Sequence, residues 1–118
     1  MTRIEHDPDY GDIYFVDFEP STGHEYQKKR PAVVIQSSEQ LKRSSLVTIM
    51  PLTSQIGKKL SEDILLKKDH TNCLFMNSII KVHCISSFDK SRFIRKIGKI
   101  DTQTLDQIKA YLRNHFGL

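Results

Sequence analysis

The chain has no apolar run that approaches the roughly 20 residues of a membrane-spanning helix. Residues 1–7 also lack the apolar stretch of a secretory signal, so we expect a cytoplasmic protein that does not cross a membrane. Internal repeats, linkers and low-complexity tracts are absent too, and 118 residues leave room for one core but not two. These absences predict a single domain over residues 1–118.

Cysteine is scarce: the chain holds only Cys73 and Cys84, and they do not form a CxxC pair. In a reducing compartment such thiols are small core residues more often than a bridge, and we expect this of both. His70 and His83 lie close to them in the sequence, but four ligands at ordered spacing are missing. We therefore expect neither a zinc site nor any other cofactor.

Acidic side chains are scarce over most of the chain. The formal net charge is +4, but residues 1–27 hold one basic and seven acidic side chains, a balance of −6. Residues 28–118 hold seventeen basic and seven acidic ones, a balance of +10. This asymmetry suggests a positive surface that attracts a polyanion, although many soluble domains are basic and charge alone does not identify nucleic acid as the partner.

The pattern of apolar residues predicts a mostly β domain that ends in one helix. Short runs rich in β-branched and aromatic residues, bounded by turn residues, predict strands at 11–18, 32–36, 46–52, 62–66, 77–87 and 93–100, after a polar arm at 1–10. Pro51 is expected at a strand end or bulge. Helical spacing then predicts an amphipathic helix over 102–116, with an N-cap at 101–104 and an apolar face of Leu105, Ile108, Leu112 and Phe116. The fold class is α+β, with a small, strongly curved sheet or barrel.

The connection between the first two predicted strands carries the strongest functional signal. It reads Gly23-His24-Glu25-Tyr26-Gln27-Lys28-Lys29-Arg30-Pro31 and runs into the apolar segment 32–35. Pro31 restricts the backbone beside Arg30, and the buried-looking segment anchors that end of the loop. A loop tethered in this way can hold an acid, a base and a cation close together, as phosphoryl chemistry without a metal requires.

These residues resemble the MazF/PemK toxins, which are ribosome-independent and metal-independent bacterial endoribonucleases that cut single-stranded RNA. The resemblance extends from Gly11 to the terminal helix, and its matching segments are 11–18, Pro20, 23–25, 29–35, 51–55, 89–92 and 96–98. It implies an SH3-like barrel of the CcdB/PemK type with an added helix. It also implies a homodimer and neutralisation by a cognate antitoxin protein.

The resemblance assigns some roles and departs from the family elsewhere. Arg30 and Thr53 fall where the family keeps its catalytic arginine and threonine, and Glu25 and His24 align with an acidic residue or histidine that particular members use. In the predicted strand 77–87, where alternation puts Lys81 and His83 on one face, some members have an arginine and an aspartate instead. Many members also keep an arginine or lysine where this chain has Ser86.

Metal-free RNA cleavage needs a base for the ribose 2′-hydroxyl proton, an acid for the leaving 5′-oxygen and a cation for the phosphorane. Arg30 suits the cation, because its planar fork grips two phosphate oxygens, and the Thr53 hydroxyl can donate to a third. His24 can serve as acid or base, and Glu25 as base or as the group that orients Arg30. The residues expected to contact RNA are Lys29, Ser54, Gln55, Lys58, Lys59, Lys81 and His83.

Two other functions stay open. The same barrel serves CcdB-type toxins, which bind DNA gyrase and catalyse nothing, and the chain could also be a degenerate interaction module. The presence of both Arg30 and Thr53 favours the ribonuclease.

Overall fold

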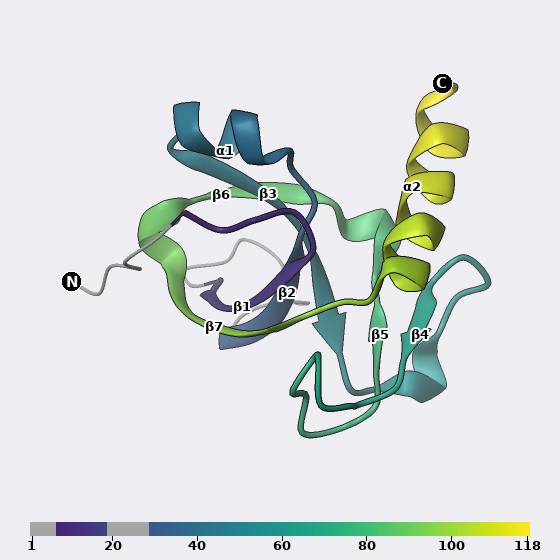
Figure 1. Ribbon diagram of the computed structural model, residues 1–118. Helices are drawn as coiled ribbons and strands as arrows, with labels where there is room; N and C mark the ends of the chain where they lie inside the picture. The colour runs from purple at the N-terminus through teal and green to yellow at the C-terminus, as the bar shows by residue number, and fades with distance from the viewer. Residues whose placement is uncertain (1–6, 19–28) are drawn as a thin grey trace.

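The computed structural model describes residues 7–18 and 29–118, and Figure 1 shows a curved sheet with the C-terminal helix beside it. The strands and helices, in chain order, are β1 (Asp12–Asp17), β2 (Lys29–Val34), α1 (Ser38–Arg43), β3 (Leu46–Thr53), β4 (Ile64–Leu66), β5 (Ser78–Ile80), β6 (Ser86–Asp89), β7 (Phe93–Lys99) and α2 (Thr102–Phe116). Short 3₁₀ turns lie at Ile56–Lys58, Val82–Cys84 and Lys90–Arg92.

The described strands form one antiparallel sheet in the order β4-β5-β3-β2-β1-β7, with β6 also paired to β3. Strand β3 organises this sheet, because its first half pairs with β6 and its last two residues pair with β5, while β2 runs along its other side. Two register shifts in the β1–β7 ladder bend the far end. The mostly β class with a C-terminal helix is confirmed, but β7 and β4 do not pair among the described residues, so "barrel" fits this open sheet only loosely.

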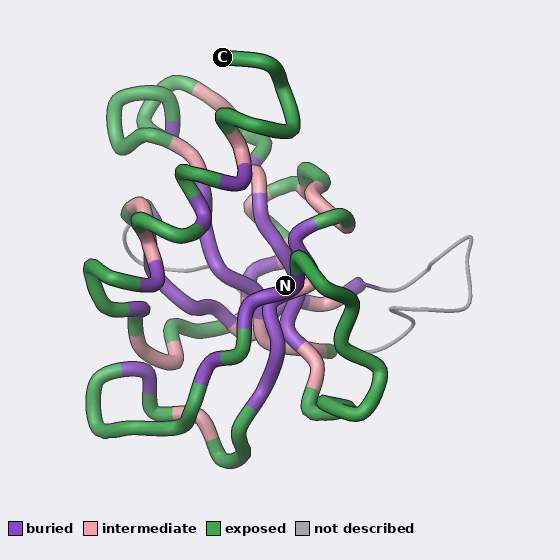
Figure 2. The backbone as a smooth tube through the Cα atoms, turned by 90° about the vertical axis from the view of Figure 1, so that its right-hand side faces the viewer, coloured by how far each residue is buried: buried purple, intermediate pink, exposed green. Residues whose placement is uncertain are grey.

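Alternation along the strands sends side chains into two separate cores. On β1, Ile13 enters one cluster, and Tyr14 and Val16 enter the other. Helix α2 covers the first cluster with Ile108, and α1 covers the second with Leu41. Figure 2 shows the buried stretches, in purple, gathered toward the middle of the molecule, with exposed green loops around them.

The predicted helix over 102–116 is confirmed as α2. The Asp101 side chain accepts a hydrogen bond from the Thr104 N–H at 2.7 Å, and Gly117, at a φ of +70°, ends the helix in the left-handed conformation. Its buried face differs slightly from the prediction, because Tyr111 is buried whereas Phe116 is 56% exposed. Among the described residues, no helix is long and apolar enough to cross a membrane.

The predicted strand 77–87 is wrong, because β5 stops at Ile80 and β6 starts only at Ser86. The Lys81 N–H donates to the Pro51 carbonyl at 2.9 Å, and the chain then turns through Val82–Cys84. Lys81 and His83 therefore do not share a strand face. Pro51 itself lies inside β3, at the point where that strand changes partner from β6 to β5, so its missing N–H interrupts no ladder.

Candidate functional site

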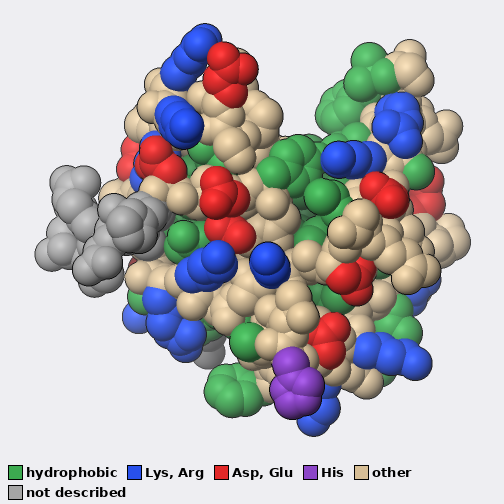
Figure 3. Space-filling model, viewed as in Figure 1, with side chains coloured by type: hydrophobic (Ala, Val, Ile, Leu, Met, Phe, Trp, Pro, Cys, Tyr) green, Lys and Arg blue, Asp and Glu red, His purple; other side chains and the backbone are tan. Residues whose placement is uncertain are grey.

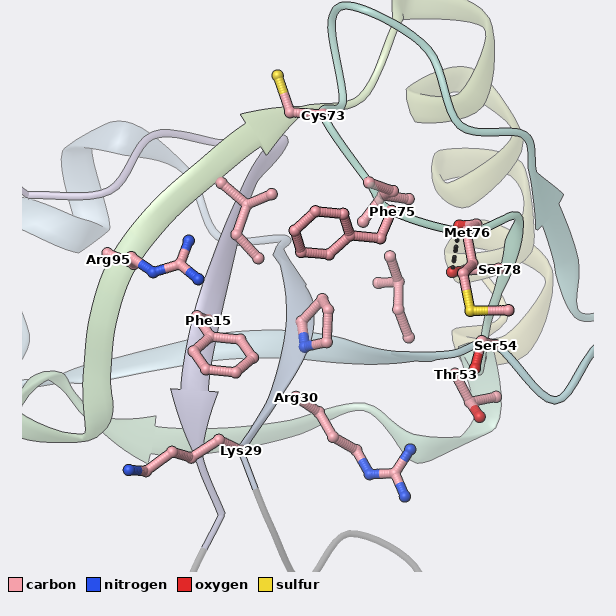
Figure 4. A pocket seen from close by; sticks show the side chains of 14 residues that line it. Phe15, Lys29, Arg30, Thr53, Ser54, Cys73, Phe75, Met76, Ser78 and Arg95 are labelled. Atoms are coloured by element: carbon pink, nitrogen blue, oxygen red, sulfur yellow. Dashed lines mark hydrogen bonds between the residues drawn. The ribbon is translucent and has the colours of Figure 1, made fainter.

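A cavity of about 630 Å³ opens where β2 begins and β3 ends (Figure 4). Strands β1 and β7 form one side of it, and the loop 67–77 between β4 and β5 forms another. The described residues that line it are Phe15, Lys29, Arg30, Pro31, Leu52, Thr53, Ser54, Cys73, Leu74, Phe75, Met76, Ser78, Arg95 and Ile97.

Strand register brings Arg30 and Thr53 together. The β2–β3 ladder pairs Ala32 with Pro51, and the same antiparallel register, continued by two residues, places Arg30 opposite Thr53. Figure 4 shows the Arg30 side chain extending on the side of the cavity where Thr53 lies. The Thr53 hydroxyl oxygen accepts a hydrogen bond from the Gln55 N–H at 3.2 Å, so its own O–H can donate to a bound group. A guanidinium and a hydroxyl donor thus converge on one position.

The cavity favours an anion. Lys29, Arg30 and Arg95 line it, and its described lining contains no aspartate or glutamate. Arg95 stacks over the Phe15 ring, with the guanidinium carbon 5.0 Å from the ring centroid, and the two residues are cross-strand partners in the β1–β7 ladder. Three positively charged side chains therefore line the cavity, and a phosphate group would find several donors there.

The loop 67–77 is held by its own polar side chains. Asn72 is 1% exposed, its side-chain oxygen accepts from the N–H groups of Asp69 and Leu74, and its amide nitrogen donates to the Lys67 carbonyl. The Asp69 carboxylate accepts from the Asn72 N–H at 2.7 Å. Gly98 of β7 permits the close approach of this loop, because a Cβ there would lie 2.4 Å from the Asn72 carbonyl oxygen.

This ordered loop presents apolar side chains at the cavity. Phe75 is 93% exposed and Met76 is 59% exposed. Cys73 has a φ of +57°, is exposed and lines the cavity, so the expectation that it lies in the core is wrong. Cys84 is half-buried, and both cysteines are free thiols.

The residues predicted to contact RNA are divided between the cavity and other places. Lys29 and Ser54 line the cavity beside Arg30 and Thr53. The others do not line it, and their contact with RNA stays a prediction: Gln55, Lys58 and Lys59 follow β3 on the exposed turn, and Lys81 and His83 lie in the segment after β5. His24 and Glu25 fall outside the described residues, as does every residue of the tethered loop before Lys29.

Lys81 is held by a buried partner. Its ammonium group donates to Asp63 at 2.7 Å, and the Asp63 side chain is 0% exposed. Burial opposes ionisation of this carboxyl, but the Lys81 ammonium and the N–H groups of Leu60 and Val82 outweigh it and hold the pKa of Asp63 below its usual range. This ion pair ties the end of β5 to the start of β4.

His83 belongs to a chain of hydrogen bonds that reaches α2. Its Nε2 lies 3.0 Å from Glu62, and its Nδ1 lies 3.1 Å from the Tyr111 hydroxyl, which in turn lies 3.2 Å from Nδ1 of His115. In neutral His83 the proton lies on Nε2, beside Glu62, and the Tyr111 hydroxyl then donates to Nδ1 of His83 and accepts from Nδ1 of His115. Burial, followed by the nearby carboxylates, raises the pKa of Tyr111 and keeps its hydroxyl protonated.

Residues 9–116 match the family model described as "PemK-like, MazF-like toxin of type II toxin-antitoxin system". The chain belongs to this family. The resemblance seen in the sequence is thereby confirmed.

Curated MazF-family relatives and a solved MazF structure agree with this assignment. Endoribonuclease MazF9 of Mycobacterium tuberculosis is 29% identical over 113 residues, which cover 92% of this chain and 95% of the relative. Endoribonuclease EndoA of Bacillus subtilis is 30% identical over 104 residues, covering 87% and 89%. The crystal structure of MazF from Deinococcus radiodurans superposes with a TM-score of 0.81 at 23% identity and covers 97% of this chain and all (100%) of that one, which supports the fold.

The family motifs pointed to Arg30 and Thr53 but missed the other side of the cavity. Leu74, Phe75 and Met76 form an apolar run inside a mostly polar loop, a signal that sequence inspection could have used. Arg95 offered no such signal, because its position over Phe15 depends on the shifted register of β7 against β1.

Proposed function

We propose that this MazF/PemK-family chain is a metal-independent, sequence-selective endoribonuclease that cleaves single-stranded RNA and acts as the toxin of a toxin–antitoxin pair. The observation that carries the proposal is the convergence of Arg30 and Thr53 in a cavity with three cations and no carboxylate among its described lining residues. Two curated relatives that align over most of the chain are named endoribonucleases.

In the proposed reaction the ribose 2′-oxygen attacks the adjacent phosphorus, and the bond from phosphorus to the 5′-oxygen breaks. The products are a 2′,3′-cyclic phosphate and a 5′-hydroxyl. Arg30 stabilises the negative charge of the phosphorane, and the Thr53 hydroxyl donates to one of its oxygens. Glu25 and His24 lie five and six positions before Arg30 in the sequence, and we assign to this pair the removal of the 2′-hydroxyl proton and the protonation of the 5′-oxygen.

The family match favours this function over binding of DNA gyrase by a CcdB-like toxin. A module that only binds a protein surface has no need of a guanidinium and a hydroxyl at the same end of a cationic cavity. The same geometry speaks against a degenerate module.

The partners of the chain follow from its family. We propose that a cognate antitoxin protein neutralises it, that it works as a homodimer and that it acts in the cytoplasm, where RNA is the substrate. Several large apolar side chains outside the cavity are exposed and available for such contacts, namely Leu46, Ile56, Leu60, Leu65 and Leu118.

The test is cleavage of a mixed RNA transcript in EDTA, followed by analysis of the fragment ends. We expect fragments with 5′-hydroxyl ends, and we expect Arg30→Ala to slow cleavage by about 10²-fold or more. Arg113→Ala, on the exposed last turn of α2, is the matched control and should cleave like wild type. Cleavage by Arg30→Ala within a few-fold of wild type would overturn the role of Arg30.

A further inference from the structure

The cavity has an aromatic side that the cleavage step does not use. Arg30 and Thr53 stand at the ends of β2 and β3, whereas Phe15 and Arg95 line the part formed by β1 and β7. Figure 4 shows Phe75 reaching in from the loop on the side of Phe15 and Arg95. A volume of about 630 Å³ falls within the range of roughly 300–1,000 Å³ that holds a whole small-molecule ligand, so the cavity accommodates more than one phosphate.

The exposure of Phe75 is not a consequence of disorder in its loop. Asp69 and Asn72 hold the loop through side-chain hydrogen bonds to its backbone, and Ser78 donates to the Met76 carbonyl at 3.0 Å. None of these bonds involves the Phe75 ring. A phenyl ring that is 93% exposed on an ordered loop, and that the loop does not need for its own structure, is suited to cover a ligand.

Across the cavity, the Arg95 guanidinium lies over the Phe15 ring with 5.0 Å between guanidinium carbon and ring centroid. This contact keeps the guanidinium beside the Phe15 ring, where it can stack on a second flat group or donate to it. Aromatic faces beside cations match an unpaired nucleobase on an anionic backbone, because the base stacks while its phosphates meet positive charge.

We propose that Phe75, together with Phe15 and Arg95, forms a subsite for one unpaired nucleobase of the RNA, next to the phosphate bound at Arg30. This inference rests on the proposed RNA cleavage for the position of the phosphate and adds the residues that bind the base. Stacking on Phe75 holds the nucleotide in place and so determines the position at which the RNA is cut.

Binding of a 2′-O-methyl oligonucleotide tests the subsite, since the methyl group blocks the attacking oxygen and the ligand stays intact. We expect Phe75→Ala to weaken binding by on the order of tenfold or more, and Phe75→Trp to retain it. Phe116→Ala is the matched control, because Phe116 is also an exposed phenylalanine but lies on α2 and does not line the cavity. Circular dichroism should show the same folded signal for all three variants.

A second set of oligonucleotides identifies the base itself. Each lacks the base at one position, and that position moves along the strand one nucleotide at a time. At the position that occupies the subsite, the missing base weakens binding to wild type, but Phe75→Ala causes little additional loss. The proposal is overturned if Phe75→Ala binds like wild type, if its effect adds to that of every missing base, or if it weakens only the binding of an antitoxin protein.

The two proposals can fail separately. If the losses of affinity from the missing base and from Phe75→Ala are not additive but no RNA is cleaved, the subsite is supported and the ribonuclease activity is contradicted. If Arg30→Ala abolishes cleavage and Phe75→Ala changes neither affinity nor cut sites, the ribonuclease activity is supported and the subsite is contradicted.

Discussion

The Thr53 hydroxyl can either speed the cleavage step or only help to bind the RNA. Substitutions that remove or keep this hydroxyl distinguish the two roles. Thr53→Val keeps the volume but removes the O–H, and we expect turnover to fall by about 10²-fold while the affinity for a 2′-O-methyl oligonucleotide changes little. Thr53→Ser keeps the hydroxyl and should retain most of the activity. The measurements are kcat for RNA cleavage and Kd for the oligonucleotide.

The same two measurements can also contradict this role of the Thr53 hydroxyl. Equal losses in affinity and in kcat/KM for Thr53→Val would show that the hydroxyl binds the ground state and gives the transition state nothing extra. A loss of stability in urea would instead trace the effect to the Gln55 N–H, which donates to this oxygen.

The ion pair between Lys81 and Asp63 lies outside the described lining of the cavity, and we expect it to stabilise the fold. Lys81→Met leaves the buried Asp63 carboxylate without its cation, and we expect the free energy of unfolding to fall by about 3 kcal/mol in urea titrations. The double variant Lys81→Met/Asp63→Asn removes the orphaned charge and should recover part of that loss. A change within about 0.5 kcal/mol for Lys81→Met would show that the pair is dispensable.

The lowered pKa of Asp63 also predicts how acid affects stability. The unfolded chain takes up a proton at this side chain near pH 3.9, before the folded chain does, so acidification through this range favours unfolding. The contribution of Asp63 is therefore complete above about pH 5 and is lost as the pH falls toward the folded pKa. Urea titrations between pH 6 and 3 should show a smaller decline for Asp63→Asn than for wild type, and parallel curves would contradict this prediction.

At the scale of elements, the sequence predicted those helices and strands whose formation depends on residues close together in the chain. Helix α2 was predictable because Asp101, the helical spacing and Gly117 all lie within one stretch of chain. The break after Ile80 was not, because it depends on contacts of Lys81 with Pro51 and Asp63, distant in the sequence. Helix α1 was not predicted either, since its six residues bury only Leu41 and begin at a single cap, Ser37.

The residues of the candidate site also fall into those that the sequence predicted and those that it did not. Arg30, Thr53, Lys29 and Ser54 could be found from motifs because they lie at the ends of two adjacent strands. The role of the loop 67–77 could not, since its position depends on a backbone-to-backbone contact with β7 that no alternation of residues reveals.

That contact gives a prediction for the loop as an element. In Gly98→Ala the added Cβ would meet backbone atoms of Asn72 and Thr71 at 2.4–2.7 Å, so either the loop or β7 must move. We expect a loss of about 1–3 kcal/mol in unfolding free energy, together with weaker RNA binding as Phe75 is displaced. Gly57→Ala is the control, because nothing lies within 4 Å of its Cβ position, and it should be neutral. Equal stability of the two variants would show that the loop is not fixed by Gly98.

At the scale of the whole molecule, charge guides the RNA only where it is concentrated. On the face seen in Figure 3, lysine and arginine side chains are interspersed with aspartate and glutamate, so that face is no uniform basic track. The described lining of the cavity, in contrast, holds Lys29, Arg30 and Arg95 and includes no aspartate or glutamate. The net charge of +4 therefore understates the attraction at the cavity itself.

Salt should weaken RNA binding steeply for this reason. For single strands each phosphate contact adds about −0.7 to the slope of log affinity against log salt, so three contacts give about −2. Lys29→Ala should reduce the slope by about 0.7, and Arg113→Ala should leave it unchanged. Titrations of a 2′-O-methyl oligonucleotide at several salt concentrations measure it, and a flat dependence would rule out the cavity as the place where the RNA backbone binds.

The hydrogen-bonded loop between β4 and β5 separates the residues that fold it from the residues it displays. Asp69, Asn72 and Gly98 hold its backbone, whereas the side chains of Phe75 and Met76 are 93% and 59% exposed. Substitutions at positions 75 and 76 consequently remove few contacts of the folded state, so natural drift or a randomised library can change them while the fold persists. New target preferences could then arise from two side chains on an unchanged scaffold.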